Sequence, residues 1–258
     1  VYEDSPAQEA GIVVGDYITA IDGTDVKSLS GVDAVQSRLQ GEAGTIVNVT
    51  WLDSKAASRT ADLTHSGYTS TTVDYQMLDS VGYIKIRQFD GSTPSELDYA
   101  IRSLTTSGAQ SLVFDLRDNG GGYVDLATAV ADIFIDDDVI FSSKDKYGRK
   151  LAYYADPGAW DIPVVLILNK YSASASEILA GALRDSAGAE LVGTVSFGKG
   201  IMQSVYTFSD GESGMQTTSE YWYTPGGECI HGEGLKPDVE VELPEDALDE
   251  NFNIIREK

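Results

Sequence analysis

The sequence predicts an α/β core built on a mixed sheet, preceded by a smaller domain. From residue 81 onward, short apolar runs alternate with segments of helical periodicity, in the order strand, helix, strand, helix, strand. That order implies crossover connections within one sheet. Residues 54–80 are polar and rich in Ser and Thr, which indicates a connection between two units. The chain has 258 residues, 42% of them hydrophobic, and is long enough for one large core or two domains.

The chain therefore divides into four predicted parts. Residues 1–53 form the small domain, and residues 54–80 are connecting strands or a linker. The core extends over residues 81–242, and a charged, loosely held C-terminal tail covers residues 243–258.

Turn residues and short periodic runs define the elements of the small domain. A short helix follows the Ser5-Pro6 turn and ends at Gly11, and a strand follows at 17–21. A second helix, at about 31–39, carries apolar residues at helical spacing. Residues 45–52 alternate between apolar and polar as a strand does.

Three successive strand-to-helix units are predicted in the core. The strands are residues 82–89, 111–116 and 164–168, and a helix follows each of them. The first helix opens on the capping box Thr93-Pro94-Ser95-Glu96. The remaining predicted elements are a charged loop at 143–146, a strand at 190–193, and a hairpin formed by 203–208 and 215–223.

Charge and composition exclude several classes of function. The formal net charge is -23 at pH 7, which argues against nucleic acid and anionic membrane partners, because both would repel the chain. One cysteine, Cys229, and two histidines, His65 and His231, form no cluster with the spacing of metal ligands. We therefore expect no metal, no cofactor and no disulfide within the chain. No apolar stretch approaches the roughly 20 residues that span a bilayer, and no signal peptide is visible at Val1.

The segment SASASE, residues 172–177, is the first candidate for chemistry. Ser174 and Glu177 have the spacing of a capping box, so the local sequence favours a helix N-cap. The same position suits a nucleophile, because a helix N-terminus after a strand presents backbone N–H groups and the positive end of the helix dipole. On this segment alone, both interpretations stay open.

A serine nucleophile needs a base, and neither histidine has a favourable context. His65 falls in the polar connection and His231 in a Gly-rich turn, where surface positions are common. No G-x-S-x-G elbow occurs. An S-x-x-K motif at 143–146 falls in the expected charged loop and not in the helix that would align its side chains.

Lys199 is the better candidate for the base. It lies in the apolar, glycine-flanked stretch 197–202, and no acid within several residues would hold it charged. A lysine base has to be neutral, which burial favours. Gln203, four residues further on, could orient a neutral amine without charging it. A plain surface-loop lysine is the competing interpretation.

The loop at 115–122, DLRDNGGG, is the third candidate. Its simplest interpretation is a turn from a strand to a helix. Three glycines after a buried strand also expose backbone N–H groups at the sheet edge where open α/β folds bind ligands. A phosphate loop would end in Gly-Lys-Ser/Thr, whereas this loop continues with Tyr123.

Taken together, these segments resemble the C-terminal processing (tail-specific) peptidases, serine peptidases with a Ser–Lys dyad and an inserted PDZ domain. The stretch SPAQEAGIVVGDYITAIDG at 5–23 is similar to the family's PDZ segment. The resemblance runs over nearly the whole chain and implies a protease core with a mixed sheet and ββα-type spiral crossovers, plus a partial PDZ domain. The matching core stretches are DLRDNGGG at 115–122, NKYSASASEILAGALRD at 169–185, GTVSFGKGIMQ at 193–203 and YTPGGECIHGEGLKPDVEVE at 223–242.

The resemblance also implies a role for individual residues. The nucleophile would be Ser174, the base Lys199, and the group that positions the lysine Gln203. The oxyanion would be held by the backbone N–H groups of Gly122 and Ala175. The motif positions that look supportive are Gly121, Glu177, Asp185 and Arg117.

As function, the resemblance implies a bacterial serine endopeptidase that cleaves proteins near their C-termini through an acyl-enzyme. Its substrates would have apolar C-terminal tails, its location would be extracytoplasmic, and movement of the PDZ domain would control the dyad. The carboxylate-binding loop of the PDZ groove would precede residue 1, as would the family's N-terminal helical segment. We therefore expect an incomplete groove, and any homodimer would form through the missing segments.

Two other functions stay open. One is a catalytically inactive PDZ-containing binding or regulatory protein, against which the intact Ser174, Lys199 and Gln203 weigh. The other is a crotonase-like acyl-CoA enzyme, which needs basic residues for phosphates. A chain with 18 Lys and Arg against 41 Asp and Glu offers few of them.

Overall fold

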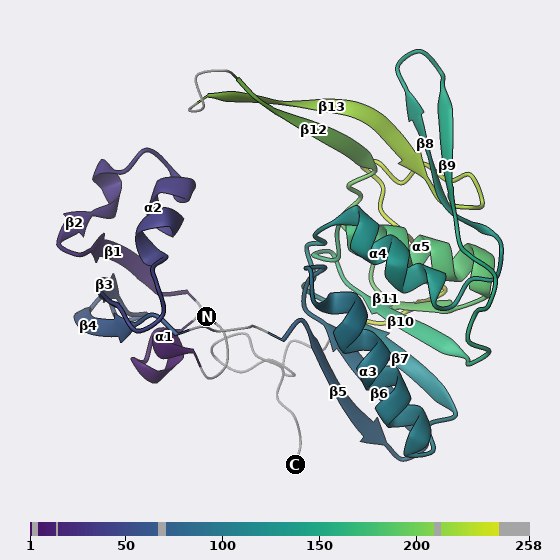
Figure 1. Cartoon of the computed structure of the whole chain (residues 1–258), viewed down its shortest axis with the longest axis horizontal. Helices are drawn as coiled ribbons and strands as arrows, with labels where there is room; N and C mark the ends of the chain where they lie inside the picture. The colour runs from purple at the N-terminus through teal and green to yellow at the C-terminus, as the bar shows by residue number, and fades with distance from the viewer. Residues whose placement is uncertain (2–4, 14, 67–70, 209–212, 243–258) are drawn as a thin grey trace. The chain divides into compact units, whose positions relative to one another are not determined.

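The computed structural model describes residues 1, 5–13, 15–66, 71–208 and 213–242 (Figure 1). The chain forms two compact units, which divide between Ser70 and Thr71. The predicted C-terminal tail, residues 243–258, lies outside the described residues.

The first unit is a small antiparallel sheet with two short helices. The sheet has the order β2-β1-β3-β4, and its buried centre includes Ile21, Val49 and Trp51. Ser5 caps the first helix, because its Oγ accepts a hydrogen bond from the Gln8 N–H at 3.2 Å. The elements are α1 (Pro6–Glu9), β1 (Tyr17–Ile21), β2 (Thr24–Asp25), the 3-10 turn η1 (Val26–Ser28), α2 (Val32–Leu39), β3 (Ile46–Leu52) and β4 (Ser58–Thr64).

The segment 54–80, predicted as connecting strands or a linker, contributes one strand to each unit. Strand β4 pairs with β3 along its whole length in the first unit. Strand β5 (Val73–Leu78) pairs with β6 (Val81–Ile86) in the second.

The second unit is built on a six-stranded mixed sheet of order β14-β11-β10-β7-β6-β5. All neighbouring pairs are parallel except β5 with β6, which confirms the predicted mixed sheet. The further strands of this sheet are β7 (Ser111–Asp115), β10 (Val164–Leu168), β11 (Glu190–Gly193) and β14 (Val239–Glu240).

Three helices connect these parallel strands: α3 (Thr93–Thr106), α4 (Val124–Asp132) and α5 (Ala175–Ala187). The chain moves in one direction across the sheet, from β6 to β7, β10 and β11, so right-handed crossovers place all three helices on one face. Figure 1 shows them as a row beside that face. The buried sheet residues beneath them include Ile84, Ile86, Leu112, Phe114, Leu166, Leu168 and Leu191.

A second, antiparallel sheet of order β12-β13-β8-β9 belongs to the same unit. Its strands are β8 (Val139–Asp145), β9 (Lys150–Tyr154), β12 (Ile201–Thr207) and β13 (Gly214–Tyr223). The predicted hairpin is confirmed as β12 and β13. The predicted charged loop at 143–146 is wrong for Ser143 to Asp145, which end β8. A register irregularity near Ile140 breaks the apolar alternation and hid this strand in the sequence.

Candidate active site

Ser174 lies at the junction between β10 and α5, where it caps the helix as predicted. Its backbone has φ 59° and ψ -116°, a conformation that non-glycine residues rarely adopt. Strain of this kind persists only where surrounding contacts fix it, and it is concentrated at functional sites. The half-buried hydroxyl thus sits on a sharp turn at the carboxyl end of a buried parallel strand.

Glu177, in the first turn of α5, joins the two candidate catalytic segments. Its Oε2 accepts hydrogen bonds from the backbone N–H groups of Ser174, at 2.8 Å, and Lys199, at 2.9 Å. Its Oε1 accepts from the Gly198 N–H and the Ser196 hydroxyl. The side chain is fully buried. One carboxylate therefore holds the backbones of Ser174 and Lys199 next to each other.

Ser196, which the sequence did not indicate as a site residue, is buried and links Glu177 to the 235 segment. Its hydroxyl donates to Glu177 at 2.5 Å and accepts from the Leu235 N–H at 2.7 Å. A buried serine between the exposed Val195 and Phe197 gives no periodic signal, so only the fold reveals it.

Lys199 has a fixed backbone and an unpaired side chain. The Trp222 indole N–H donates to the Lys199 carbonyl at 2.9 Å. Gly198 and Gly200 let the loop approach the 230–234 segment, because a Cβ on either would lie within 3.0 Å of its backbone. The half-buried Nζ forms neither a hydrogen bond nor an ion pair with any residue that the structure describes.

The glycine loop 119–122 lies directly against Ser174. A Cβ on Gly121 would be 2.7 Å from the Ala173 carbonyl and 2.9 Å from Ser174 Cβ, so only glycine fits, and its φ of 102° also favours glycine. The backbone N–H groups of Gly122 and Ala175 have no acceptor within the described parts of the chain. An oxyanion hole requires unpaired backbone N–H donors of this kind.

The two flanking serines of SASASE hold this arrangement in place. The Ser172 hydroxyl donates to the Leu116 carbonyl at 2.8 Å, and the Ser176 hydroxyl donates to the Asn119 carbonyl at 3.0 Å. Both hydroxyls are buried. They tie the turn that carries Ser174 to the loop that follows β7.

The remaining predicted residues form hydrogen bonds with groups other than Ser174 and Lys199. Gln203 is exposed on β12, where its Oε1 accepts from Gln216 at 3.1 Å, and no hydrogen bond joins it to Lys199. The carboxylate of Asp185 accepts from Arg184 and from the Gly226 N–H. Arg117 pairs with Asp115 through both ends of its guanidinium.

Asp115 is the buried centre of this last group. Its carboxylate is fully buried and accepts from Arg117 at 2.6 Å and from the Tyr83 hydroxyl at 2.6 Å. Burial alone would raise the pKa of Asp115, but these hydrogen bonds outweigh it and place the pKa below its ordinary value. Burial and the neighbouring carboxylate raise the pKa of Tyr83 to about 12.

Asp115→Asn should lower the free energy of unfolding by about 3 kcal/mol, because it leaves Arg117 partly buried without its partner. Since the folded-state pKa of Asp115 is lowered, its contribution is present above the unfolded value of about 3.9 and is lost as the pH falls through the folded value. Urea denaturation from pH 7 to pH 2 measures both effects. Asp98→Asn, at an exposed helix pair with Arg102, is the control and should change little. Equal effects of the two variants would contradict the prediction.

Both histidine rings contact residues other than Ser174. The His65 ring nitrogens lie 2.8 Å from Thr45 Oγ1 and 3.0 Å from the Leu39 carbonyl, within the first unit. The His231 ring packs edge-on against Tyr221, with centroids 5.4 Å apart. Neither ring hydrogen-bonds to Ser174.

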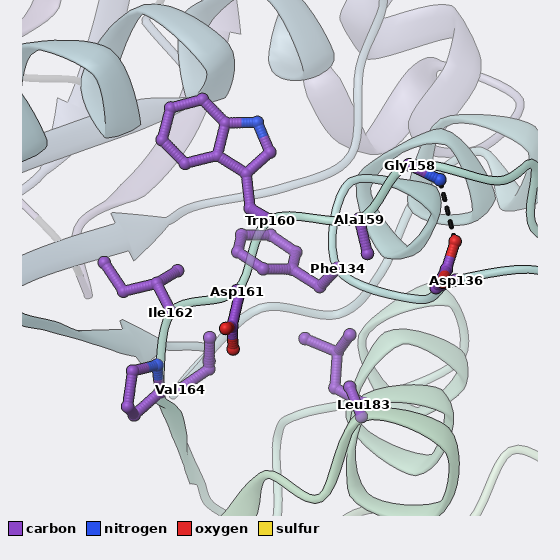
Figure 2. A pocket seen from close by; sticks show the side chains of 11 residues that line it. Phe134, Asp136, Gly158, Ala159, Trp160, Asp161, Ile162, Val164 and Leu183 are labelled. Atoms are coloured by element: carbon purple, nitrogen blue, oxygen red, sulfur yellow. Dashed lines mark hydrogen bonds between the residues drawn. The ribbon is translucent and has the colours of Figure 1, made fainter.

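A cavity of about 430 Å³ lies elsewhere in the second unit (Figure 2). Trp160, Ile162 and Leu183 line it, and Asp136 accepts from the Gly158 N–H at 2.8 Å at its rim. Val164, which also lines it, begins β10, whereas Ser174 follows the end of that strand. The cavity is therefore at the opposite end of the sheet from Ser174. The candidate site is assigned from the hydrogen bonds around Ser174 and Lys199, and not from this cavity.

Two features are absent from the described residues. They contain no helix that is both long and apolar enough to cross a membrane. They also contain no group of three or more His, Cys, Asp or Glu side chains placed to hold a metal ion.

Comparison with known families and proteins gives consistent matches. Residues 80–241 match the model of peptidase family S41, and residues 1–53 match a PDZ domain. A probable CtpA-like serine protease of Staphylococcus haemolyticus is 37% identical over 249 residues, covering 94% of this chain and 49% of that protein. A carboxyl-terminal-processing protease of Synechocystis is 36% identical over 247 residues, covering 93% and 57%. The chain thus spans about half the length of the curated relatives it matches.

The fold is also similar to that of solved structures. The photosystem II D1 C-terminal processing protease superimposes with a TM-score of 0.66 at 34% identity, covering 93% of this chain and 67% of that one. An S41 protease from Bacteroides fragilis superimposes with a TM-score of 0.64 at 18% identity, covering 96% and 70%, which supports the fold alone.

Proposed function

This chain belongs to peptidase family S41, and we propose that it is a serine endopeptidase that cleaves proteins near their C-termini. The observation that carries the proposal is the buried Glu177 carboxylate, which accepts hydrogen bonds from the backbones of both Ser174 and Lys199. These bonds bring together the backbones of the two segments that carry the proposed nucleophile and base. Relatives named as carboxyl-terminal-processing proteases support the same substrate position.

The proposed reaction uses each group according to its chemistry. Neutral Lys199 takes the proton of the Ser174 hydroxyl as Oγ attacks the scissile carbonyl carbon. The free N–H groups of Gly122 and Ala175 stabilise the oxyanion that forms. The protonated amine then returns its proton to the leaving amine, and water hydrolyses the acyl-enzyme by the same route. Lys199 has no competing partner in the described structure, so its amine is available for this transfer.

The PDZ domain supports protein substrates, because such domains bind extended C-terminal tails by strand addition. Apolar tails, assembly through segments outside this sequence, and action outside the cytoplasm remain predictions from the family resemblance. The supporting roles of Gln203, Arg117 and Asp185 are proposals of the same kind.

Labelling with a serine-reactive phosphonate tests the nucleophile directly. We expect one phosphonate per chain, attached to Ser174, and no labelling of Ser174→Ala, since the variant has no hydroxyl to react. Ser143→Ala is a matched control, because Ser143 is a buried serine in the S-x-x-K motif at 143–146 and its loss should not affect labelling. Labelling that persists in Ser174→Ala would contradict the assignment and favour an inactive binding protein or another nucleophile. Mass spectrometry of the modified peptide gives the result.

A further inference from the structure

The hairpin formed by β8 and β9 carries a concentration of positive charge that the rest of the chain lacks. Lys144, Lys146, Arg149 and Lys150 lie within seven positions, with Asp145 as the only acid among them. The whole chain has 41 acidic and 18 basic residues. This local excess of cations is therefore the reverse of the overall balance.

The register of the hairpin places like charges opposite each other. Lys144 on β8 is the direct cross-strand partner of Lys150 on β9. Two like charges at this spacing destabilise a sheet unless an anion lies near them. None of the lysines in the hairpin forms an ion pair with a residue that the structure describes. Glu220, on the neighbouring strand, lines the same surface hollow as Lys144 and Lys146 but forms no ion pair with either.

Asp145 does not balance these lysines. Its carboxylate accepts from Arg149 at 2.6 Å and from the Tyr147 and Arg149 N–H groups, each at 2.9 Å. These bonds close the turn, and Gly148, with φ 83°, completes it. On the neighbouring strand, Glu220 is the partner of Asp145, so two acids stand against four cations at this end of the sheet.

The turn also presents an aromatic ring between two cations. Tyr147 is 73% exposed, with Lys146 Nζ at 5.0 Å and Arg149 Cζ at 5.7 Å from its ring centroid. Leu151, one residue beyond the Lys144–Lys150 pair, is 54% exposed. Tyrosine flanked by Lys and Arg, with an exposed aliphatic residue beside it, is the composition of segments that lie at an anionic membrane surface.

Distance along the strand reduces the repulsion expected from the net charge. Three aspartates, 136–138, precede the base of β8, and Figure 1 shows the hairpin extending away from α4 and α5. Seven strand residues separate that base from the turn by about 20 Å. Charges further apart than the Debye length, about 8 Å at physiological salt, are largely screened. The turn can therefore attract an anionic surface that the protein as a whole would repel.

We propose that the β8–β9 turn, residues 144–151, docks this protein on anionic lipid surfaces. The cations contact lipid phosphates, and Tyr147 and Leu151 enter the headgroup region. A purely electrostatic surface, such as one that binds an acidic polypeptide, would have no use for the exposed Tyr147 and Leu151. The observations therefore favour the membrane.

Vesicle sedimentation tests the proposal. We expect the full chain to bind vesicles of equal parts phosphatidylglycerol and phosphatidylcholine, and not vesicles of phosphatidylcholine alone. Lys146→Glu/Lys150→Glu should weaken binding about 30-fold or more, because each lysine near an anionic surface contributes about fivefold to the affinity. Tyr147→Ala should weaken it several-fold. Both variants change exposed side chains only. Lys150→Glu puts a negative charge directly opposite Lys144, so this cross-strand pair should not weaken the hairpin.

The control keeps the change in net charge and moves it elsewhere. Lys27→Glu/Lys55→Glu alters two exposed lysines of the first unit and should leave vesicle binding unchanged. The proposal is overturned if the wild-type chain does not bind, if the hairpin variant binds as well as wild type, or if the control loses binding equally. Binding to poly-glutamate without binding to vesicles would also overturn it and identify an acidic polypeptide as the partner.

Discussion

Lys199→Ala should reduce peptide cleavage by about a thousandfold or more in kcat, because the Ser174 hydroxyl then has no base. The fold should be unaffected, since Nζ makes no hydrogen bond or ion pair with a described residue and the loop is held through its backbone. Lys199→Arg should be equally inactive, because a guanidinium stays protonated and cannot accept the proton. Steady-state cleavage of a peptide substrate and urea denaturation measure the two properties separately.

Histidine variants supply the control for this prediction. His231→Ala and His65→Ala should keep cleavage within a few-fold of wild type, since the His65 ring lies in the first unit against Thr45 and Leu39 and the His231 ring packs on Tyr221. If Lys199→Ala stays near wild type while His231→Ala loses activity, the base is the histidine and the Ser–Lys assignment is wrong.

Glu177→Gln should reduce kcat by about a hundredfold or more, although the side chain touches no reacting atom. In the variant, an amide nitrogen replaces one of the two carboxylate oxygens. This nitrogen is itself a donor, so it cannot accept the hydrogen bonds that the replaced oxygen accepted. At Oε2 the donors of those bonds are the Ser174 and Lys199 backbones, so the spacing of nucleophile and base is lost. Unpaired buried donors cost about 1–3 kcal/mol each, so stability should fall as well.

Three measurements separate positioning from simple loss of stability. Positioning predicts a fall in kcat larger than any change in KM, and slower phosphonate labelling of Ser174 at temperatures where the variant is fully folded. Glu177→Asp keeps the negative charge that Glu177→Gln removes, but its side chain is one methylene shorter and cannot reach all four donors. It should therefore be more stable than Glu177→Gln and recover little of the activity. Glu190→Gln, an exposed glutamate at the start of β11, is the matched control. Full activity in a folded Glu177→Gln would disprove the positioning role.

Much of the second unit could be predicted from sequence because its signals are local. Buried parallel strands read as apolar runs, and capping residues and glycines mark the helix ends, so β7, β10 and α5 lie where periodicity puts them. The β8–β9 hairpin was missed because its outer face is charged and a register irregularity breaks its alternation. A charged strand and a charged loop have the same composition.

The candidate site was only partly predictable, for a different reason. A capping box at Ser174 and Glu177 is visible in six residues, but the second partner of that carboxylate lies 22 positions away. No local pattern encodes that contact: the apolar, glycine-flanked context indicated Lys199 as a candidate base but not that Glu177 binds its backbone. Gln203 is an example of a local pattern that predicts a contact the structure does not have. Its spacing from Lys199 suggests that the two side chains meet, but in strand β12 the Gln203 side chain bonds to Gln216.

The hydrogen bonds of Ser196 have a consequence for the timing of protein synthesis. This side chain links Glu177 to the backbone of Leu235, near the end of the peptidase unit. A ribosome releases the chain from its N-terminus, so Ser174 and Lys199 emerge well before the segment that fixes their spacing. A nascent chain that ends before Leu235 lacks this link, so the contact that ties Glu177 to the 235 segment through Ser196 forms late in synthesis.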